Sequence, residues 1–393
     1  MSQIRMGFMI QTYRNLQCCQ VLISICFFIT CDPSQKHLLA NFTPGPSQLY
    51  FTVKDHMKRA FRDGVPSLSH RSKEFESIFE STSSRLKELL GIPDNFTIVY
   101  TSSATEIWER SIQSLAEQTS LHLVNGAFSK RYFEVAQQLM KVPSKIEVAD
   151  GRGFDSNEFS GNPELIALTH NETSTGVSLP LSFIHSFREK HPGALIVVDA
   201  VSSLPYPDFD FKLVDSIFFS VQKGFGLPAG LGVWIVNARC IAKAEKMLAS
   251  GKPVGSYHSL PSLISFAKKR QTPETPNVLA LYLLSKVLED FIHKGVKSIR
   301  KETEYKAALL YHWLDSAQIA RPFVADKALR SNTVIVMECA VNINKIVPAL
   351  NAQGLFPGEG YGKAKSTQLR FANFPAHSKE QFESLVDTLS TVV

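Results

Sequence analysis

Cysteine is scarce over most of this 393-residue sequence, since only Cys240 and Cys339 follow residue 31. A secreted fold that depends on disulfide bonds would distribute its cysteines along the whole chain. The main part of the chain is therefore predicted to work in a reducing compartment, and we expect a cytoplasmic location. The other cysteines all lie near the N-terminus, at Cys18, Cys19, Cys26 and Cys31.

Signals of nucleic-acid and metal binding are also missing from the sequence. It has no block of lysine and arginine, no zinc-ligand spacing and no RNA-binding signature. Its 42 basic and 36 acidic residues give a mild net charge of +6, spread along the chain. With 44% hydrophobic and 20% charged residues, the composition excludes collagen-like, coiled-coil and wholly disordered chains. We therefore expect a globular protein that binds neither nucleic acid nor a metal ion.

An apolar run near the N-terminus covers residues 21–29 and follows Arg5 and Arg14. A transmembrane helix needs roughly 20 apolar residues, so this run is too short for an ordinary one. Its length suits the core of a signal peptide, but no small-x-small cleavage site follows it. A signal or anchor, a structured extension, and residues added by an upstream start stay open as alternatives. We treat residues 1–36 as an N-terminal extension outside the fold and predict no membrane association.

From residue 96 onward, short apolar segments alternate with amphipathic helical patterns. The apolar segments are rich in Val, Ile and Phe and are often apolar throughout, as in strands buried on both faces of a parallel sheet. Helices are expected at 105–118, 129–140 and 182–190. This order predicts an α/β fold with three layers and a mostly parallel sheet. The predicted strands are 97–101, 121–125, 146–149, 165–169, 195–199, 216–221 and 232–236.

The C-terminal part of the sequence has a different pattern. A long helical stretch at about 277–316 is followed by a strand, a helix, a strand and a final helix. We expect these four elements at 333–339, 344–353, 367–372 and 379–391. The chain is therefore predicted to have a large domain at 37–276 that includes an N-terminal arm, and a smaller α+β domain at 277–393.

Lys223 lies where a predicted buried strand enters a glycine-rich turn. It follows the apolar residues 217–221 and Gln222, and it precedes the segment 224–230, which contains three glycines. An amine that forms a Schiff base must be partly desolvated, and small neighbours leave room for a flat ring. On this segment alone, an ordinary surface lysine in a loop remains the alternative.

Asp199 ends the predicted strand 195–199. Open α/β sheets bind ligands at the carboxyl ends of their strands, and a carboxylate buried there needs a positively charged partner. A helix N-cap or a metal ligand remains the alternative for this aspartate. Its spacing of 24 residues from Lys223, with one strand between them, favours a shared site.

Two further polar segments follow predicted strands. Ser103, Ala104 and Thr105 lie at the expected start of a helix, where free N–H groups and hydroxyls form a phosphate cradle. Plain helix capping is the alternative, and the Gly-Lys-Ser/Thr of a nucleotide-binding loop is absent. The polar segment 170–176 either lines a ligand site or is a solvated loop.

Taken together, six segments resemble the class V aminotransferases, which are fold-type I enzymes that use pyridoxal 5'-phosphate (PLP). They follow one another in the family's order, and the resemblance covers residues 37–393. Within the family, the sequence is most similar to the phosphoserine aminotransferases, particularly at 69–75 and 89–96. The six segments are 41–46, 69–75, 170–176, 199–203, 220–224 and 272–276.

The resemblance implies a role in cofactor binding for residues at several positions. Lys223 would bind the cofactor covalently and shuttle a proton, and Asp199 would pair with the ring nitrogen. Phe128 would stack on the cofactor ring. Thr173 would form a hydrogen bond on the side of the ring that carries the phenolic oxygen. The phosphate would be held by Ser103, Ala104, Thr105 and Gln222, and by Thr275 of a neighbouring subunit in a homodimer.

The resemblance also implies which residues bind the substrate. Arg370 matches the arginine that binds the α-carboxylate, for which a planar guanidinium is suited because it bonds both oxygens. His70 and Arg71 match a pair that lines the side-chain pocket. The family's His-Arg pair before the carboxylate-binding arginine is replaced by Lys363 and an alanine, and the cradle lacks the family's arginine. Lys363 or Lys365 would replace part of the missing positive charge, but only as a point charge.

The implied activity is PLP-dependent transamination between 3-phosphoserine and 2-oxoglutarate, small molecules that require no nucleic acid, metal or membrane. The alternative is a small non-phosphorylated amino acid, such as serine, alanine or aspartate, with glyoxylate or pyruvate. A cysteine desulfurase is disfavoured because the glycine-rich loop 354–365 contains no cysteine. A non-enzymatic or membrane-tethered protein that has kept the fold is the remaining alternative.

Overall fold

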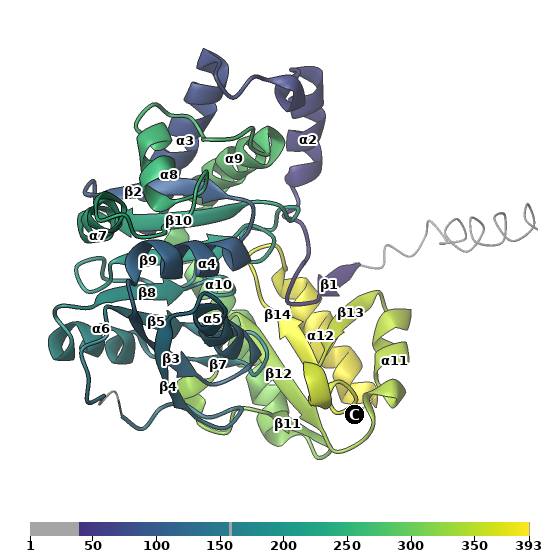
Figure 1. Ribbon diagram of the computed structural model, residues 1–393. Helices are drawn as coiled ribbons and strands as arrows, with labels where there is room; N and C mark the ends of the chain where they lie inside the picture. The colour runs from purple at the N-terminus through teal and green to yellow at the C-terminus, as the bar shows by residue number, and fades with distance from the viewer. Residues whose placement is uncertain (1–38, 157–158, 393) are drawn as a thin grey trace, which may run out of the picture. The chain divides into compact units, whose positions relative to one another are not determined.

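The computed structural model describes residues 39–156 and 159–392, so the predicted extension at 1–36 lies outside the described residues. Its largest sheet has seven strands in the order β2-β10-β9-β8-β5-β3-β4 (Figure 1). Strand β10 runs antiparallel to both of its neighbours, and the other paired strands are parallel. The strands are β2 Phe96–Thr101, β3 Thr119–Val124, β4 Val142–Glu147, β5 Leu165–Thr169, β8 Leu195–Asp199, β9 Ser216–Ser220 and β10 Gly232–Asn237.

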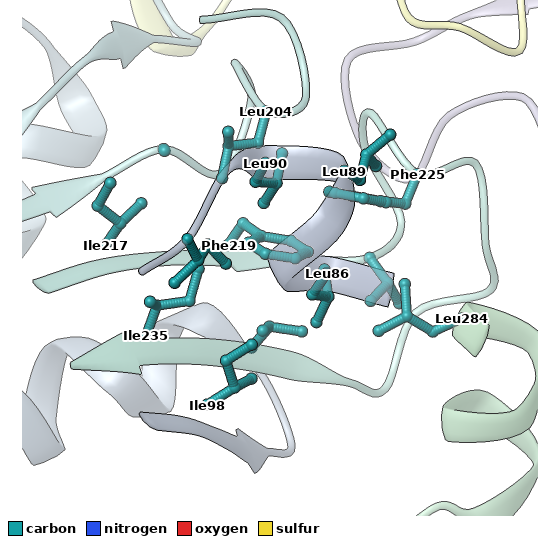
Figure 2. Packing of buried hydrophobic residues seen from close by; sticks show 14 of the residues in the cluster. Leu86, Leu89, Leu90, Ile98, Leu204, Ile217, Phe219, Phe225, Ile235 and Leu284 are labelled. Atoms are coloured by element: carbon teal, nitrogen blue, oxygen red, sulfur yellow. The ribbon is translucent and has the colours of Figure 1, made fainter. Parts of the chain in front are cut away.

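Successive residues of these strands belong to two different hydrophobic clusters. In β9, for example, Phe219 packs with one cluster and Phe218 with the other. Side chains alternate between the two faces of a strand, so each cluster covers one face of the sheet. Figure 2 shows the first cluster, in which Ile98, Ile217 and other strand residues contact leucines of α3 and α9. Burial on both faces explains why the central strands are apolar throughout.

Helices cover both faces of this sheet and complete the predicted three layers. Helices α3 Lys73–Leu90, α6 Leu181–Lys190 and α9 Val278–Lys294 contribute to the first cluster. The second cluster contains residues of α4 Ala104–Leu115, α5 Ala127–Gln138, α7 Ala238–Ala249 and α8 Leu260–Ala267. The α/β fold predicted from the sequence is therefore confirmed.

A second sheet has the order β1-β13-β14-β12-β11 and is largely antiparallel. Its strand β1 comes from the N-terminal arm and pairs in parallel with β13 (Figure 1). A separate cluster of apolar residues joins these strands to α10, α11 and α12. The elements are β1 Ala40–Phe42, β11 Ala320–Pro322, β12 Val334–Cys339, β13 Leu355–Glu359, β14 Gln368–Ala372, α10 Val296–Ser316, α11 Val347–Ala352 and α12 Lys379–Val392.

The remaining elements are short or lie on the surface. Helix α2 Val53–Arg62 follows the arm, and the strands β6 Asn171–Glu172 and β7 Val177–Ser178 form a small hairpin. The helical stretch predicted at 277–316 is two helices, α9 and α10, separated by Gly295. Gly295 has a φ of 84°, a left-handed conformation that interrupts a helix and that glycine adopts readily. The domain boundary at residue 276 stays a prediction.

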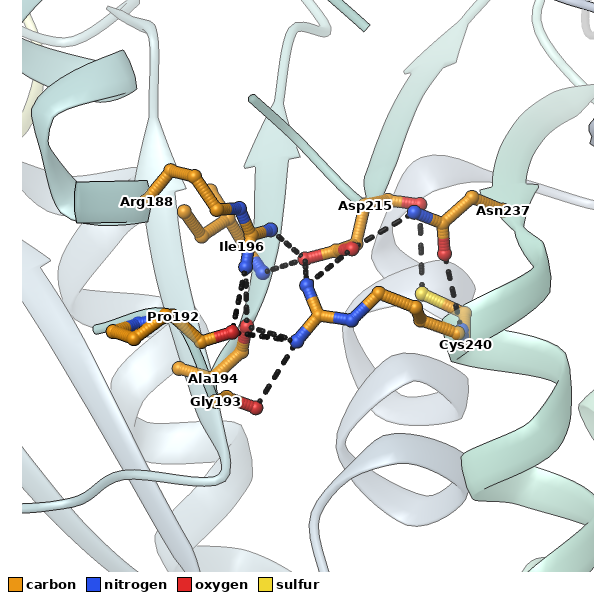
Figure 3. Close-up of polar contacts among 9 residues, drawn as sticks. Arg188, Pro192, Gly193, Ala194, Ile196, Asp215, Asn237 and Cys240 are labelled. Carbon is orange, nitrogen blue, oxygen red and sulfur yellow. Dashed lines mark hydrogen bonds and ion pairs between the residues drawn. The ribbon is translucent and has the colours of Figure 1, made fainter. Parts of the chain in front are cut away.

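The large sheet has a buried carboxylate at the edge opposite to the carboxyl ends of its parallel strands (Figure 3). Asp215 is 1% exposed and accepts hydrogen bonds from Ile196 N at 2.8 Å and Asn237 Nδ2 at 2.8 Å. It also forms ion pairs with Arg188 and with Arg239, the latter at 3.0 Å. These bonds satisfy the buried carboxylate and join β8, β9, β10 and two helices.

The described residues contain no helix that is both long and apolar enough to cross a membrane. The apolar run at 21–29 is not among them.

Candidate active site

A cavity of about 210 Å³ lies at the carboxyl edge of the parallel strands. This is the edge at which open α/β sheets bind their ligands. The cavity brings together eight of the residues predicted from the sequence, and they come from five separate segments. These residues are Ser103, Ala104, Thr105, Phe128, Thr173, Asp199, Gln222 and Lys223.

Lys223 is buried at 9% exposure in a turn that follows β9. Its Nζ donates a hydrogen bond to Pro44 O at 2.6 Å and lies 5.8 Å from the centre of the Phe128 ring. Burial, with the positive charge of Arg370, lowers the pKa of Lys223 to about 8, against the opposing effect of nearby carboxylates. A Cβ at Gly45 would lie 2.3 Å from Nζ, so the approach of the lysine requires glycine there. The amine is therefore desolvated and partly neutral near neutral pH, as a nucleophile requires.

Asp199 is the last residue of β8 and is 4% exposed. Its Oδ2 accepts a hydrogen bond from Trp108 Nε1 at 2.8 Å, and its Oδ1 accepts one from Val201 N at 3.0 Å. Burial raises the pKa of Asp199 to about 6, although both hydrogen bonds oppose the shift. A carboxylate in this environment favours a positively charged or protonated group placed beside it.

The start of α4 forms one wall of the cavity. Ser103 is the N-cap of this helix, and its Oγ accepts a hydrogen bond from Glu106 N at 3.1 Å. Ala104 N donates to Ser220 Oγ at 2.8 Å, which ties the helix start to the end of β9. Thr105 is exposed at the helix surface. A helix N-terminus with hydroxyl groups beside it favours an anion, and the phosphate cradle at these residues stays a prediction.

Phe128 is held in place by a buried glutamate at the end of β6. Glu172 is fully buried, and it accepts hydrogen bonds from Phe128 N at 3.3 Å and from Ser129 N at 2.9 Å. It also accepts bonds from the hydroxyls of Ser129 and Ser174, at 2.9 and 2.6 Å. The carboxylate thus takes the free N–H groups at the start of α5, a position that favours negative charge. The orientation of the aromatic ring depends on this arrangement.

Asn171, Thr173 and Gln222 place polar atoms around the cavity. Asn171 Nδ2 donates to Ser202 Oγ at 2.7 Å, and Thr173 Oγ1 donates to the same oxygen at 2.8 Å. Asn171 Oδ1 and Gln222 Oε1 are buried and have no hydrogen-bond partner within the described part of the chain. Because a buried polar atom without a partner is costly, both oxygens indicate that the cavity accepts a polar ligand.

Arg370 comes from β14 of the second sheet and lies next to the cavity. Its Nη1 donates to Thr173 O at 3.3 Å, and its Nε donates to Glu359 O at 2.8 Å. The ring of Tyr361 is 5.6 Å from the guanidinium carbon and 5.5 Å from the Phe128 ring. An arginine in this position presents its remaining N–H groups to a carboxylate bound near Phe128.

Five predicted residues do not line this cavity: Arg370, which lies beside it, and the four described here. Arg71 is exposed and donates to Gln271 Oε1 at 2.8 Å and Thr272 O at 2.9 Å. Burial, together with the charge of Arg71, lowers the pKa of His70. Thr275 and Lys363 are both exposed at the surface of the chain. Within a single chain, the structure therefore does not bring the predicted side-chain pocket together with the cavity.

The comparisons with known proteins agree with this geometry. Residues 40–357 match the profile of the family described as aminotransferase class-V. The chain belongs to the class-V aminotransferase family. This aminotransferase is 48% identical to a solved phosphoserine aminotransferase, SerC, from Cytophaga hutchinsonii. The TM-score is 0.89, and the match covers 90% of this chain and 99% of that one.

Two other relatives of the aminotransferase are informative. It is 30% identical over 330 residues to the phosphoserine aminotransferase of Rhodococcus opacus (strain B4), which covers 83% of this chain and 87% of the relative. A PLP-bound phosphoserine aminotransferase from Trichomonas vaginalis is 19% identical, with a TM-score of 0.75, and covers 90% of this chain and 99% of that one. At that identity the likeness shows the fold alone.

Class-V aminotransferases use PLP, and the predicted cofactor is therefore confirmed. The cavity of this aminotransferase also fits PLP on its own geometry. It combines a desolvated amine, a buried carboxylate, an aromatic ring and a helix start that binds anions. These match the aldehyde, the ring nitrogen, the flat ring and the phosphate of the cofactor. The unpartnered oxygens of Asn171 and Gln222 supply further polar contacts.

Three residues near the site of the aminotransferase were not predicted from the sequence. Trp108 lies on α4 at helical spacing among apolar residues, and such a residue is typical of a core position. Glu172 and Asn171 belong to the polar segment 170–176, for which the sequence predicts a place at a ligand site. It does not predict a role for either residue. The density of polar residues after β5 was the available signal for both, whereas nothing in the sequence distinguished Trp108.

Proposed function

We propose that this aminotransferase transfers an amino group between 3-phosphoserine and 2-oxoglutarate. The observation that carries the proposal is the 48% identity to the SerC structure over 90% of this chain. The buried Lys223 and Asp199 supply the two groups that such chemistry needs, at the ligand-binding edge of the sheet. The choice of 2-oxoglutarate rests on the resemblance to the family.

Lys223 and Asp199 would carry the chemical step. When bound, PLP supplies an electron sink for the bond that breaks at the α-carbon of the amino acid. Lys223 Nζ would take the proton from that carbon and deliver it during the return reaction, for which a pKa of about 8 is suited. Asp199 would hold a proton on the ring nitrogen, and Trp108 Nε1 would keep the carboxylate oriented.

The remaining residues would bind and orient. Ser103, Ala104 and Thr105 would hold the cofactor phosphate, assisted by Gln222. Phe128 would stack on the ring, and Thr173 would bond the ring's phenolic oxygen. Arg370 would bind the α-carboxylate of the substrate through both oxygens.

A second candidate is transamination of a small non-phosphorylated amino acid with glyoxylate or pyruvate. Two observations favour it. The guanidinium of Arg71 donates hydrogen bonds to Gln271 and to main-chain carbonyls of the same segment. Lys363 is exposed, and Lys365 forms an ion pair with Glu359 at 3.2 Å. If none of these three side chains contacts the phosphate of the substrate, the enzyme would bind phosphoserine no better than serine.

We further propose that the protein works as a cytoplasmic homodimer. The exposed position of Thr275 supports this assembly, because the residue is free to reach a second subunit. His70, Arg71 and Lys363 would then complete the substrate pocket, which a single chain leaves incomplete.

Spectroscopy of the holoenzyme tests the two candidates together. Each of phosphoserine, serine, alanine, aspartate and glutamate is mixed with the enzyme, and the loss of the visible absorption of lysine-bound PLP is followed. Addition of 2-oxoglutarate, pyruvate or glyoxylate then shows which keto acid restores the absorption. The proposal expects phosphoserine and glutamate to react fastest, with 2-oxoglutarate as acceptor. Equal reaction with phosphoserine and serine would contradict it and support the second candidate.

A further inference from the structure

His258 forms a buried bridge between two carboxylates outside the cavity. Its side chain is 4% exposed and lies in the loop between α7 and α8. His258 Nδ1 contacts Glu106 Oε1, and Nε2 forms an ion pair with Glu274 Oε2 at 2.6 Å. Glu106 is 152 positions before His258 in the sequence, whereas Glu274 follows in the same region of the chain. Within the described residues no group of three or more His, Cys, Asp or Glu side chains is arranged to hold a metal ion, so the bridge is not a metal site.

Glu106 lies on the helix start proposed to bind the phosphate in this chain, and Glu274 lies beside the residue proposed to reach the phosphate of the partner subunit. Glu106 is in the first turn of α4, and its Oε2 accepts hydrogen bonds from Ser102 N at 2.9 Å and Ser102 Oγ at 2.6 Å. It therefore braces the turn that carries the cradle. Glu274 directly precedes Thr275, and its main-chain oxygen accepts a bond from Thr272 Oγ1 at 2.7 Å. The bridge thus links the cradle to the segment that is proposed to enter the partner's site.

The charges of this cluster bear on anion binding. Two carboxylates close to a phosphate site repel the phosphate unless positive charge compensates them. His258 lies between them, and Arg110 Nε is 3.9 Å from Glu106 Oε1. Arg110 also pairs with Glu109 at 3.2 Å, and His70 is close enough for the charge of Glu274 to act on it. An imidazolium at His258 is therefore needed to keep the site receptive to an anion.

The pKa values agree with a charged bridge. Burial lowers the pKa of His258, but the bond to Glu106 and the charges of Glu106 and Glu274 outweigh it and raise the pKa to about 9. Burial likewise raises the pKa of Glu106, yet the bonds from His258 and Ser102 bring it down to about 2. His258 and Glu106 are therefore both ionised around neutral pH.

We propose that His258, held as an imidazolium between Glu106 and Glu274, is a positioning residue of the phosphate site. It neutralises the carboxylate in the first turn of α4 and fixes the segment of Thr275. Its effect is specific to the phosphate of the cofactor, because the ring-binding residues lie on other segments. This inference rests on the proposed function, since it requires that PLP binds in the cavity.

Binding of PLP and of pyridoxal to the apoenzyme separates the phosphate from the ring. Dissociation constants are measured by absorbance for the wild type, His258→Gln and the double variant His258→Gln with Glu106→Gln. His191→Gln is the matched control, because His191 is also buried but lies at the end of α6 away from the cavity. Circular dichroism and thermal melting check the fold of each variant.

For His258→Gln we expect PLP binding to weaken by about 10- to 100-fold, the range of a hydrogen bond to a charged group, while pyridoxal binding is unchanged. The double variant removes the unpaired carboxylate while keeping an oxygen acceptor for Ser102, and it should regain part of the PLP affinity. Equal loss of PLP and pyridoxal, or no loss of either, would overturn the inference. Failure of the double variant to regain affinity would overturn it too.

The pH dependence needs no variant and therefore remains informative if His258→Gln does not fold. The pKa of His258 is raised, so its charge is complete below the ordinary value of 6.5 and is lost as the pH rises through about 9. The ratio of PLP to pyridoxal affinity should fall across that range in the wild type. Lys223 and Asp199 affect both ligands and cancel in the ratio. A ratio that is flat through pH 9 would contradict the inference.

The same measurements distinguish this inference from the proposed function. A wild-type apoenzyme that binds neither ligand would overturn the proposed function and the inference with it. Wild-type binding with the same ratio in His258→Gln would overturn the inference alone.

Discussion

Burial moves the pKa values of the two central residues toward each other. It lowers that of Lys223 to about 8 and raises that of Asp199 to about 6. Each shift reflects the cost of keeping a charge in an environment from which water is excluded. The site therefore holds a lysine that is partly neutral and a carboxylate that gains from a protonated partner. Both properties suit a cofactor that carries an aldehyde and a basic ring nitrogen.

Replacement of Lys223 by alanine tests the role of the amine directly. The variant should lose the visible absorption of lysine-bound PLP, and transamination should fall by about 10²- to 10⁴-fold, the usual contribution of a proton-transfer group. Absorbance spectra and steady-state assays measure the two effects. Lys212→Ala, at an exposed position, is the control and should behave as the wild type. An unchanged spectrum in Lys223→Ala would support a non-enzymatic protein that has kept the fold.

Trp108→Phe removes the indole N–H that donates to Asp199 Oδ2. A donor stabilises the ionised carboxylate, so its loss should raise the pKa of Asp199 above about 6. In a plot of PLP affinity against pH, we expect the acidic limb to shift to higher pH by about one unit. Trp234→Phe is the matched control, because Trp234 is a buried residue of β10 in the same sheet but donates to Ser216. A shift of equal size in both variants would mean that packing is responsible.

At the scale of single elements, the Asp215 cluster stabilises the sheet on the side away from the cavity. Asp215→Asn removes the negative charge but leaves Arg188 and Arg239 in place. Loss of one partner of a buried ion pair should lower the free energy of unfolding by about 3–5 kcal/mol. Urea denaturation measures it, and the activity of the folded fraction should stay the same.

Asp208→Asn provides the comparison for this prediction. Asp208 is 79% exposed and pairs with Arg300 at 3.3 Å. An exposed pair contributes about 0–1 kcal/mol, so this variant should be close to the wild type. A similar decrease in the free energy of unfolding of the two variants would show that the buried cluster stabilises the fold no more than an exposed ion pair does.

At the scale of the whole molecule, the sequence predicts the central sheet well. The strand predicted at 195–199 is β8 Leu195–Asp199, because burial on both faces leaves a continuous apolar run. The edge strand β4 Val142–Glu147 lies earlier than the predicted 146–149, because its exposed and half-buried residues include Pro, Ser and Lys and form no continuous apolar run. Strand β13 Leu355–Glu359 was not predicted, because two of its five residues are glycine or proline.

The candidate site was predicted where its residues lie at the end of a strand or shortly after it, as with Asp199 and Lys223. Contacts between distant segments could not be predicted from one sequence. Glu106 and His258 are 152 positions apart, and neither lies in a motif. Arg71 illustrates the converse, because its motif was visible but its hydrogen bonds to the segment at 271–273 were not.

The proposed dimer makes a prediction about exchange between subunits. Thr275→Ala should weaken PLP binding by about tenfold, although Thr275 is exposed and does not line the cavity of its own chain. The variant is then mixed with Lys223→Ala under conditions that exchange subunits. In a mixed dimer, the site of the Thr275→Ala subunit would receive an intact threonine from its partner.

Activity at limiting PLP should therefore rise on mixing, above the average of the two separate variants. If Thr275 served the site of its own subunit, each mixed dimer would contain one site without the lysine and one without the threonine, and no activity would return. Sedimentation of the mixture checks that dimers have formed. The wild type mixed with Lys223→Ala is the control, since its activity should follow the share of wild-type subunits. Recovery thus depends on which subunit contributes the threonine, which neither variant alone reveals.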